Sequence, residues 1–352
     1  MYLPVLLTKK NWRTFMKSIA LLIGIGFVTL SGCTNKGPEP ITNPVEKPYV
    51  TTPYNLENPV GFPDRKIAED NPTTLEGVSL GRMLYYDHIM DKDSSRACAS
   101  CHIQSQAFQT DNGSSQVLEH VNLSWSTNFM WNGSFQGTLE DVMTFEVEEF
   151  LKTDLTRLNN SEKYRDLFKK AFNVDVITSK EAAYALAQFE RILTSSNSRF
   201  DKFLRGEVIL TPQELTGFDL FNTEKADCFH CHGTALFTDN TPRNNGLDLN
   251  PADGYMAVTG NPKDLGRFKT PTLRNIELTA PYMHDGRFAT LEDVVDFYST
   301  GVHNTATVDP LMVYAYQGGV QLSTDEKAAL IAFLKTLTDT SYLANPELSN
   351  PF

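Results

Sequence analysis

Two short stretches of sequence decide the fold: CASCH at residues 98–102 and CFHCH at residues 228–232. Both follow the pattern Cys-x-x-Cys-His, which is the attachment signature of c-type haem. The spacing suits this chemistry because two thiols on one helical turn reach the two haem vinyl groups, while the next histidine binds the iron from its proximal side. The sequence therefore predicts two covalently bound haem c groups. Their ligands are expected to be Cys98, Cys101, His102, Cys228, Cys231 and His232.

A lone Cys-x-x-Cys pair would also suit a redox dithiol or half of a zinc site. Two copies, each followed directly by histidine, favour haem over both alternatives. The chain has only five cysteines in 352 residues, which excludes a disulfide scaffold. The formal net charge is −12, from 31 Lys+Arg and 43 Asp+Glu. This balance argues against a nucleic-acid partner, because phosphate binding needs clustered basic residues.

The similarity between the two halves extends beyond the cysteines. The pentapeptide TLEDV occurs at residues 138–142 and again at 290–294. In both copies the threonine and the aspartate three residues later can form a capping box, which predicts a helix start. We interpret the chain as a duplicated haem domain.

Apolar residues recur at positions i, i+3 and i+4 in four further segments, each with an N-cap residue in place. These segments are residues 160–172, 179–195, 211–221 and 323–337. Strand-like alternation is nearly absent. The expected fold class is therefore mainly α, with two tandem cytochrome c-like haem domains and long loops. We place these domains at residues 73–208 and 209–345.

The first 32 residues look like a secretory signal. They carry four basic residues and no acidic one, followed by an apolar run from Ile19 to Leu30. The run is shorter than the ~20 residues that span a bilayer, and it suits the h-region of a signal peptide. It closes on LSGC at residues 30–33, which resembles a bacterial lipobox and implies lipid attachment to Cys33. The alternative is a buried first helix with an unrelated cysteine.

We therefore expect a lipoprotein signal peptide over residues 1–32 and a Pro-rich tether over residues 33–72. The mature protein is expected in the periplasm, anchored by lipid through Cys33. The outer membrane is favoured because Thr34, rather than the aspartate that would signal inner-membrane retention, follows Cys33.

From about Leu80 to Leu337 the sequence resembles the bacterial dihaem cytochrome c peroxidases and the related MauG-like enzymes, which mature the tryptophan-derived cofactor of methylamine dehydrogenase. Beside the two haem motifs, the resemblance is carried by LGRMLYYD (80–87), FERILTSSNSRFDKFLRGE (189–207) and FKTPTLRNIELTAPYMHDGRFATLEDVVDFY (268–298). It implies that the N-terminal domain is peroxidatic, its haem meeting peroxide, and that the C-terminal domain transfers electrons.

The resemblance also implies a distal ligand for the C-terminal haem. Tyr298 stands where peroxidases of the family commonly have methionine and the MauG-like branch has tyrosine. An anionic phenolate would favour ferric and higher states, whereas a thioether raises the haem potential. Two alternatives stay open: Met283 as the ligand, and Tyr298 as a core aromatic residue.

At the peroxide haem an acid–base group is needed to move a proton between the peroxide oxygens. The run EVEE at residues 146–149 supplies the candidates. The internal repeat sets Glu146 opposite Tyr298, so Glu146 is the first candidate and Glu149 the second. The alternative is that these carboxylates lie on a solvated helix face.

Three further assignments follow from the resemblance. Trp131 matches a tryptophan that relays electrons between the haems, with a core tryptophan as the alternative. Calcium is expected on the carbonyls of Thr279 and Pro281 and the side chain of Asn122. His120 is a candidate sixth ligand of the N-terminal iron, or else a structural histidine.

The resemblance leaves three functions open. The first is a peroxidase that reduces hydrogen peroxide to water with electrons from a small cytochrome c or a cupredoxin, which an acidic surface would attract if the donor is basic. The second, favoured by Tyr298, is a MauG-like oxidase acting on a protein or organic substrate. The third is a non-catalytic dihaem electron-transfer protein, favoured because Asn132 and Ser134 replace the family's Asp and Arg. A homodimer is a further expectation.

Overall fold

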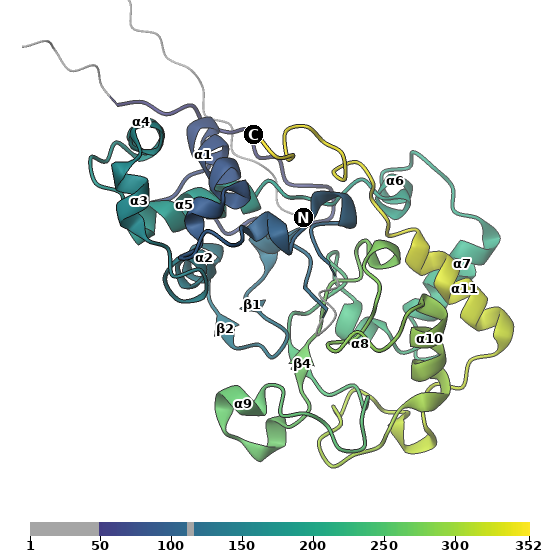
Figure 1. Ribbon diagram of the computed structural model, residues 1–352. Coiled ribbons are helices and arrows are strands. Elements are labelled where there is room, and N and C mark those ends of the chain that lie inside the picture. The colour runs from purple at the N-terminus through teal and green to yellow at the C-terminus, as the bar shows by residue number, and fades with distance from the viewer. Residues whose placement is uncertain (1–48, 111–115) are drawn as a thin grey trace, which may run out of the picture. The chain divides into compact units, whose positions relative to one another are not determined.

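The computed structural model describes residues 49–110 and 116–352 of the chain (Figure 1). The predicted signal peptide and Cys33 lie outside the described residues, as does the predicted tether up to Pro48. Residues Tyr49–Phe352 form one compact unit. Within the described ranges, no helix is both long enough and apolar enough to cross a membrane.

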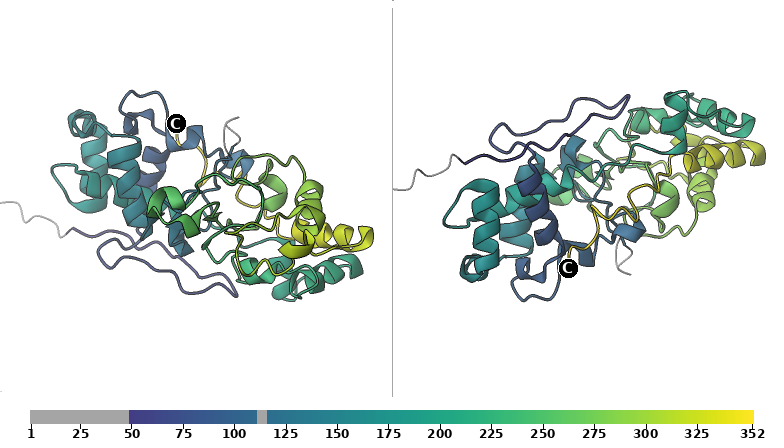
Figure 2. Two further views of the ribbon diagram at one scale, coloured as in Figure 1. Left: turned by 90° about the horizontal axis from the view of Figure 1, so that it is seen from below. Right: turned by 90° about the horizontal axis from the view of Figure 1, so that it is seen from above.

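The unit is mainly helical, as the sequence periodicity predicts, and its helices gather in two groups, one from each half of the chain (Figures 1 and 2). The helices are α1 (Leu75–Tyr86), α2 (Leu139–Phe145), α3 (Leu155–Asn160), α4 (Glu162–Phe172), α5 (Ser179–Glu190), α6 (Arg199–Leu204), α7 (Pro212–Phe221), α8 (Phe229–His232), α9 (Met256–Thr259), α10 (Leu291–Asp296) and α11 (Thr324–Lys335).

Sheet structure in the described residues is confined to two short antiparallel pairs. Strand β1 (Asn128–Phe129) pairs with β2 (Phe135–Gln136), and β3 (Pro242–Arg243) pairs with β4 (Phe268–Lys269). The near absence of strands agrees with the sequence analysis. Long loops and short 3₁₀ turns connect the helices.

Two of the four helices are capped at the predicted first residue, whereas α4 is capped by Ser161 and α5 by Thr178, each one residue away from the predicted start. Thr211 caps α7 and Ser323 caps α11, each in a capping box. The predicted helix over 179–195 ends early, at Glu190. Beyond Arg191 the backbone bonds three residues back instead of four, from Ile192 to Phe189 and from Leu193 to Glu190, and the Ser195 N–H then donates to the Asn122 side chain at 3.0 Å.

Both copies of TLEDV begin a helix, as predicted. Thr138 and Thr290 each accept a hydrogen bond from the backbone of the aspartate three residues later, and so cap α2 and α10. Each helix then continues into a π-helical turn, Glu146–Phe150 after α2 and Phe297–Gly301 after α10. Single π-helical turns inside helices occur frequently at functional sites. The two turns hold the site candidates Glu146 and Tyr298.

Each half contains one pair of helices that approach each other backbone to backbone. In α1, a Cβ added to Gly81 would lie 1.9 Å from the carbonyl oxygen of Ala185 in α5. In α7, a Cβ added to Gly217 would lie 2.0 Å from the carbonyl oxygen of Ala329 in α11. In both pairs the next residue that the added Cβ would meet is a phenylalanine four residues beyond that alanine. The same contact is therefore built twice.

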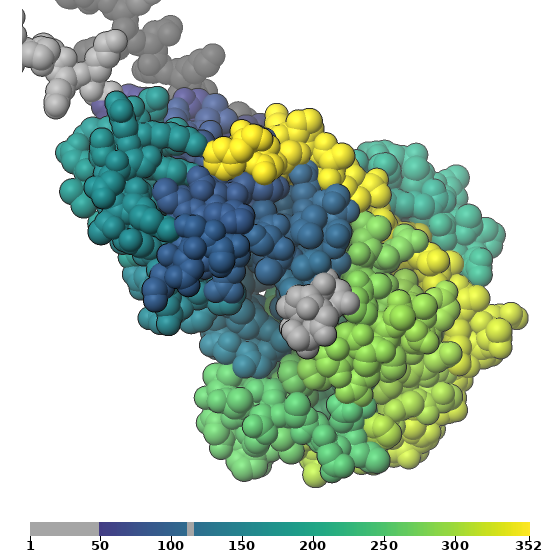
Figure 3. All heavy atoms as spheres, viewed as in Figure 1, coloured from purple at the N-terminus to yellow at the C-terminus, as the bar shows by residue number. Residues whose placement is uncertain are grey.

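Two large apolar clusters surround these helix pairs. The first is formed by buried side chains between residues 78 and 193, and the second by buried side chains between residues 200 and 337. The segment after α11 returns to the first half, where Tyr342 and Leu348 join the first cluster. Figure 3 shows this C-terminal segment in yellow against the blue surface of the N-terminal half.

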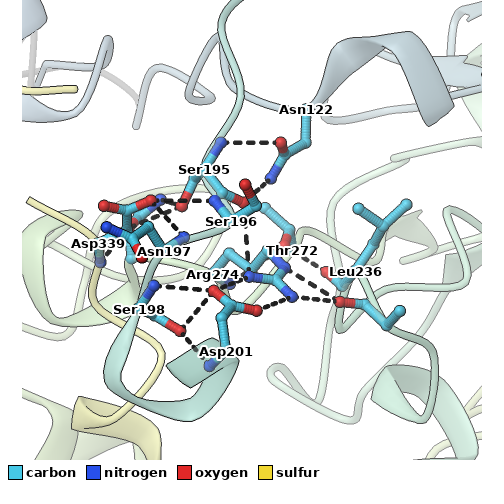
Figure 4. Close-up of polar contacts among 12 residues, drawn as sticks. Asn122, Ser195, Ser196, Asn197, Ser198, Asp201, Leu236, Thr272, Arg274 and Asp339 are labelled. Carbon is cyan, nitrogen blue, oxygen red and sulfur yellow. Dashed lines mark hydrogen bonds and ion pairs between the residues drawn. The ribbon is translucent and has the colours of Figure 1, made fainter. Parts of the chain in front are cut away.

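A buried polar network joins the two halves near the link between α5 and α6 (Figure 4). Arg274 forms an ion pair with Asp201 at 3.0 Å, and both side chains are almost fully buried. Asn122 exchanges hydrogen bonds with the backbone of Ser195, accepting one at 3.0 Å and donating one at 3.1 Å. Asp339 accepts hydrogen bonds from the backbone of residues 196 and 197. Segments far apart in the sequence are thus fixed against one another.

The helix crossings give a stability prediction. Alanine normally stabilises a helix relative to glycine by about 1 kcal/mol, but overpacking costs about 1–3 kcal/mol, and more where backbone is displaced. We therefore expect Gly81→Ala and Gly217→Ala each to lower the unfolding temperature. The control is Ser79→Ala, which changes an exposed position of the same helix α1 and should leave the unfolding temperature unchanged or slightly higher. Thermal unfolding followed by circular dichroism measures all three, and unchanged stability in the glycine variants would contradict the close packing.

Candidate functional site

A large, mainly apolar pocket surrounds the second haem motif. Its wall contains both thiols of the motif and the imidazole of His232, together with Met283 and Tyr298. The other lining side chains come largely from the second apolar cluster, including those of Phe221, Tyr282, Leu291, Val295, Leu330 and Leu334. An apolar cavity with a few converging polar groups is the usual form of a cofactor site.

Both motif histidines are held in the same orientation by the backbone. Nδ1 of His102 donates to the carbonyl of Phe108 at 3.1 Å, and Nδ1 of His232 donates to the carbonyl of Phe237 at 2.7 Å. A hydrogen bond at Nδ1 fixes the tautomer and leaves Nε2 free for a metal. All four motif cysteines are free thiols. The residues present therefore fit covalently attached haem with a histidine ligand at each motif.

Tyr298 lies in the π-helical turn Phe297–Gly301 and lines the pocket with His232. Burial raises the pKa of Tyr298 to about 12, and a hydrogen bond from Asn245 acts in the opposite direction. Nδ2 of Asn245 donates to the Tyr298 hydroxyl at 2.9 Å. The same nitrogen lies 3.7 Å from Sδ of Met283. Tyr298 and Met283, the two candidate ligands predicted from the sequence, thus both contact the side chain of Asn245.

In the first half, the π-helical turn separates the three carboxylates of residues 146–149. Glu148 and Glu149 are exposed, as the solvated-face alternative predicts, whereas Glu146 is mostly buried. Burial, with a smaller effect of the nearby Glu190 carboxylate, raises the pKa of Glu146 to about 7. Glu146 also interacts electrostatically with Cys98 of the first haem motif. The charge of Glu146 therefore acts on the first haem motif, by raising the pKa of Cys98, whereas the second candidate, Glu149, lies on the surface.

The first site contains a group of residues that the sequence analysis missed in part. The imidazole of His120 stacks on that of His102, with ring centroids 3.3 Å apart. Its Nδ1 lies 2.9 Å from the carboxylate of Glu190 and 3.4 Å from the hydroxyl of Tyr85. Burial lowers the pKa of His120 to about 3 and raises that of Glu190 well above its ordinary value.

Glu190 and Tyr85 were not predicted as site residues. The sequence did contain a signal for Glu190, because this carboxylate directly follows the mostly apolar run Ala182–Phe189. The structure buries most of that run. A carboxylate in such a run is rarely left buried without a partner or a function. Tyr85 gave no such signal, since a tyrosine in an apolar helix face looks like a core residue.

Trp131 lies between the two halves. Its indole Nε1 donates to the carbonyl of Gln116 at 2.6 Å, and its own carbonyl accepts from the N–H of Lys269 in β4 at 2.7 Å. The side chain also lines the pocket of the second haem motif. Its backbone and side chain contact both halves, although it precedes the second motif by 97 residues.

The residues predicted to bind calcium have protein partners. Oδ1 of Asn122 accepts from the N–H of Ser195, and the Thr279 carbonyl accepts from the side chain of Gln116 at 2.8 Å. Pro281 lines the pocket of the second haem motif. The contacts of these residues thus belong to the packing between the halves, and calcium binding stays a prediction.

Comparison with known proteins places the chain among dihaem enzymes. The sequence profile described as di-haem cytochrome c peroxidase matches residues 75–208. Cytochrome c551 peroxidase of Nitrosomonas europaea is 32% identical over 308 residues, which cover 78% of this chain and 84% of the relative. Methylamine utilization protein MauG of Methylophilus methylotrophus is 30% identical, covering 76% of this chain and 84% of the relative.

Among solved structures, a MauG-like protein associated with microbial copper homeostasis superposes with a TM-score of 0.77. It is 32% identical to this chain, and the match covers 85% of this chain and 99% of that protein. The dihaem peroxidase BthA from Burkholderia thailandensis has a TM-score of 0.60 at 18% identity, which is a likeness of fold alone.

The motif assignment predicts the number of covalent haems. Replacing both cysteines of one motif, Cys98→Ala with Cys101→Ala or Cys228→Ala with Cys231→Ala, should remove one of two covalently held haems, because the thioether bonds need the thiols. Intact-mass measurement on denatured protein gives the number. Ser100→Ala, between the first two cysteines, is the control and should keep both haems. Two covalent haems in either double-cysteine variant would show that the assignment is wrong.

The raised pKa of Glu146 predicts a pH-dependent stability. A carboxyl whose folded pKa is about 7 holds a proton that the unfolded chain releases near its ordinary pKa of about 4.3. Its stabilising effect is present at pH values under about 4 and is lost as the pH rises through about 7. The side chain of Glu146→Gln stays neutral throughout, so the variant does not lose this contribution. The free energy of unfolding of the variant minus that of the wild type should therefore rise between pH 5 and pH 8, by up to about 3 kcal/mol.

Urea unfolding at the two pH values measures this difference. Glu149→Gln is the matched control, since Glu149 is exposed on the same turn. The same pH dependence in both variants would mean that Glu146 is not enclosed by the protein.

Proposed function

This chain belongs to the di-haem cytochrome c peroxidase family and is an oxidoreductase of that type, and we propose that it reduces hydrogen peroxide to water with electrons from a small cytochrome c or a cupredoxin. The observation that carries the proposal is Glu146, a largely buried carboxyl with a pKa of about 7 within electrostatic reach of the first haem motif. A proton-transfer group of this kind is what peroxide cleavage requires.

Cys98, Cys101 and His102 would hold one haem, and Cys228, Cys231 and His232 the other. When bound, the haem irons supply the redox chemistry, exchanging electrons and reacting with peroxide. The protein supplies the orientation of each proximal histidine through its Nδ1 hydrogen bond. Two tandem cytochrome c-like domains, residues 73–208 and 209–345, are supported by the repeated helix crossing and by the two apolar clusters.

Glu146 takes a proton from one peroxide oxygen and returns it to the other. A pKa near 7 suits this task, because the group is then both protonated and deprotonated to a useful extent at neutral pH. The Glu190 carboxylate contributes by raising the pKa of Glu146. Glu149 is exposed and takes no part in this step.

At the second motif, Tyr298 faces the same pocket as His232, and the two side chains would close the haem on both sides. A closed haem transfers electrons without binding oxygen species. Trp131, between the halves, would relay electrons from this haem to the first. The acidic net charge suits a basic electron donor.

The proposal also includes a cellular location, a calcium ion and a homodimer. The lipobox-like sequence supports lipid attachment at Cys33 and a periplasmic protein, with the outer membrane favoured by Thr34. Calcium at Asn122, Thr279 and Pro281 rests on the family resemblance alone, and so does a homodimer.

A second function is favoured by Tyr298 and by the 30% identity to a methylamine utilization protein MauG. In this alternative the enzyme oxidises a protein or organic substrate instead of drawing electrons from a small donor. The two functions differ in their electron source, so turnover of peroxide with reduced cytochrome c separates them.

Steady-state consumption of hydrogen peroxide by the holoprotein with reduced cytochrome c tests the peroxidase. Glu146→Gln should lower kcat by about 10²–10⁴-fold, the usual contribution of a general acid–base group. Glu149→Gln should stay within about twofold of the wild type, because removing an exposed carboxylate changes no buried interaction. Haem content of each variant is measured alongside.

A wild-type holoprotein that consumes no peroxide after one-electron reduction would contradict the peroxidase. Peroxide consumption only in the presence of an organic or protein substrate would favour the MauG-like alternative. Equal activity of the wild type and Glu146→Gln would remove Glu146 from the mechanism.

A further inference from the structure

The side chain of Asn245 stands between the two side chains that could bind the C-terminal haem iron on its distal side. Its Nδ2 donates to the Tyr298 hydroxyl at 2.9 Å and lies 3.7 Å from Sδ of Met283. All three residues line the same pocket as His232. An amide nitrogen carries two hydrogens, so one Asn245 side chain can serve both neighbours.

The backbone holds Asn245 rigidly on both sides. The carbonyl of Asn244 accepts from the N–H of Asp309 at 2.8 Å, and the carbonyl of Gly246 accepts from the N–H of His303 at 2.8 Å. Gly246 has a φ of +73°, and an added Cβ would lie 2.6 Å from the His303 carbonyl oxygen. The loop is therefore fixed to the segment after Tyr298, and the amide of Asn245 has little freedom to turn away.

Met283 is held in an unusual conformation nearby. Its φ is +73°, a left-handed value that residues other than glycine rarely adopt. The thioether is nevertheless kept at the pocket wall, facing the same donor as Tyr298. A thioether and a phenol, two possible haem ligands of opposite chemical character, thus line one pocket.

We propose that Asn245 is a positioning residue that selects Tyr298 over Met283 as the distal ligand of the C-terminal haem. The inference rests on the proposed function, in which Tyr298 closes that haem. The 2.9 Å hydrogen bond favours oxygen ligation, because a donor to an ionised oxygen is roughly twice as strong as a neutral hydrogen bond. A buried phenolate without a donor is costly. The 3.7 Å contact directs the second amide hydrogen at the Met283 sulfur, which weakens the competing ligand.

The consequence concerns the reduction potential. Phenolate ligation stabilises the ferric state and lowers the potential, whereas thioether ligation raises it. Without the amide donor, the charge of an ionised Tyr298 is no longer stabilised. The sulfur of Met283 is also no longer engaged by Asn245. The thioether of Met283 would then be the favoured ligand of a haem bound in this pocket.

The experiment uses the full-length holoprotein with both haems. Asn245→Leu keeps the approximate size of the side chain and removes both donors, and Asn245→Asp keeps the shape and removes the donors if the leucine variant fails to fold. Asn250→Asp is the control, since Asn250 is exposed in the same loop. EPR and absorption spectra report the ligands of each ferric haem, and spectroelectrochemistry reports the two potentials.

In the wild type and in Asn250→Asp we expect the C-terminal haem to have a tyrosine-ligand spectrum. Its reduction potential should be lower in these two proteins than in the Asn245 variants. In both Asn245 variants we expect that spectrum to be lost, a methionine-ligand spectrum to replace it and the potential to rise. Adding Met283→Leu to Asn245→Leu should abolish the methionine-ligand spectrum. The N-terminal haem serves as an internal reference and should not change.

Three results would overturn the inference. If the Asn245 variants keep the tyrosine-ligand spectrum, with the potential unchanged or lower, Asn245 does not select the ligand although Tyr298 binds. If tyrosine is lost but Met283→Leu has no effect, the competition with Met283 is wrong. If the wild type itself lacks a tyrosine-ligand spectrum, the assignment of Tyr298 fails first, which is distinguishable because it needs no variant.

Discussion

The architecture depends on two places where helices approach so closely that a Cβ cannot fit between them. Gly81 meets α5 and Gly217 meets α11, each against an alanine carbonyl and a phenylalanine one turn later. Only glycine permits this approach, since any other side chain would overlap backbone that cannot move aside. A haem motif follows the first helix of each pair, so each crossing anchors the helix that leads to one haem site.

The repeated framework carries different chemistry in its two copies. The same capping box starts α2 and α10, and each helix continues into a π-helical turn. The first turn directs a carboxyl inward and the second directs a phenol inward. Burial raises the pKa of Glu146 to about 7, where it can exchange protons, and that of Tyr298 to about 12. The same local framework thus holds different side chains at matching positions, and the proposed function gives the carboxyl a proton-transfer role and the phenol a ligand role.

The junction between the halves decides how the two sites can communicate. The buried pair of Arg274 and Asp201 and the hydrogen bonds of Asn122 to Ser195 fix the link between α5 and α6 (Figure 4). Removing one partner of a buried ion pair leaves an uncompensated charge, so such a junction resists local change. Trp131 is held in this region by hydrogen bonds to Gln116 and Lys269. Trp131, the proposed electron relay, is therefore held by backbone contacts from both halves.

The sequence by itself determined the local features: the two haem motifs, the capping boxes of α2 and α10, and the helices with regular apolar spacing. These follow from neighbours within one or two turns, and the structure bears out the helices and caps. The internal repeat also ranked Glu146 ahead of Glu149, and the structure buries Glu146 and exposes Glu149. Only the tertiary structure decided that Glu190 pairs with His120 and that Asn245 meets Tyr298 and Met283. These contacts join residues that are distant in the chain, and no periodicity encodes them, because they arise only when helices and loops pack together and exclude water.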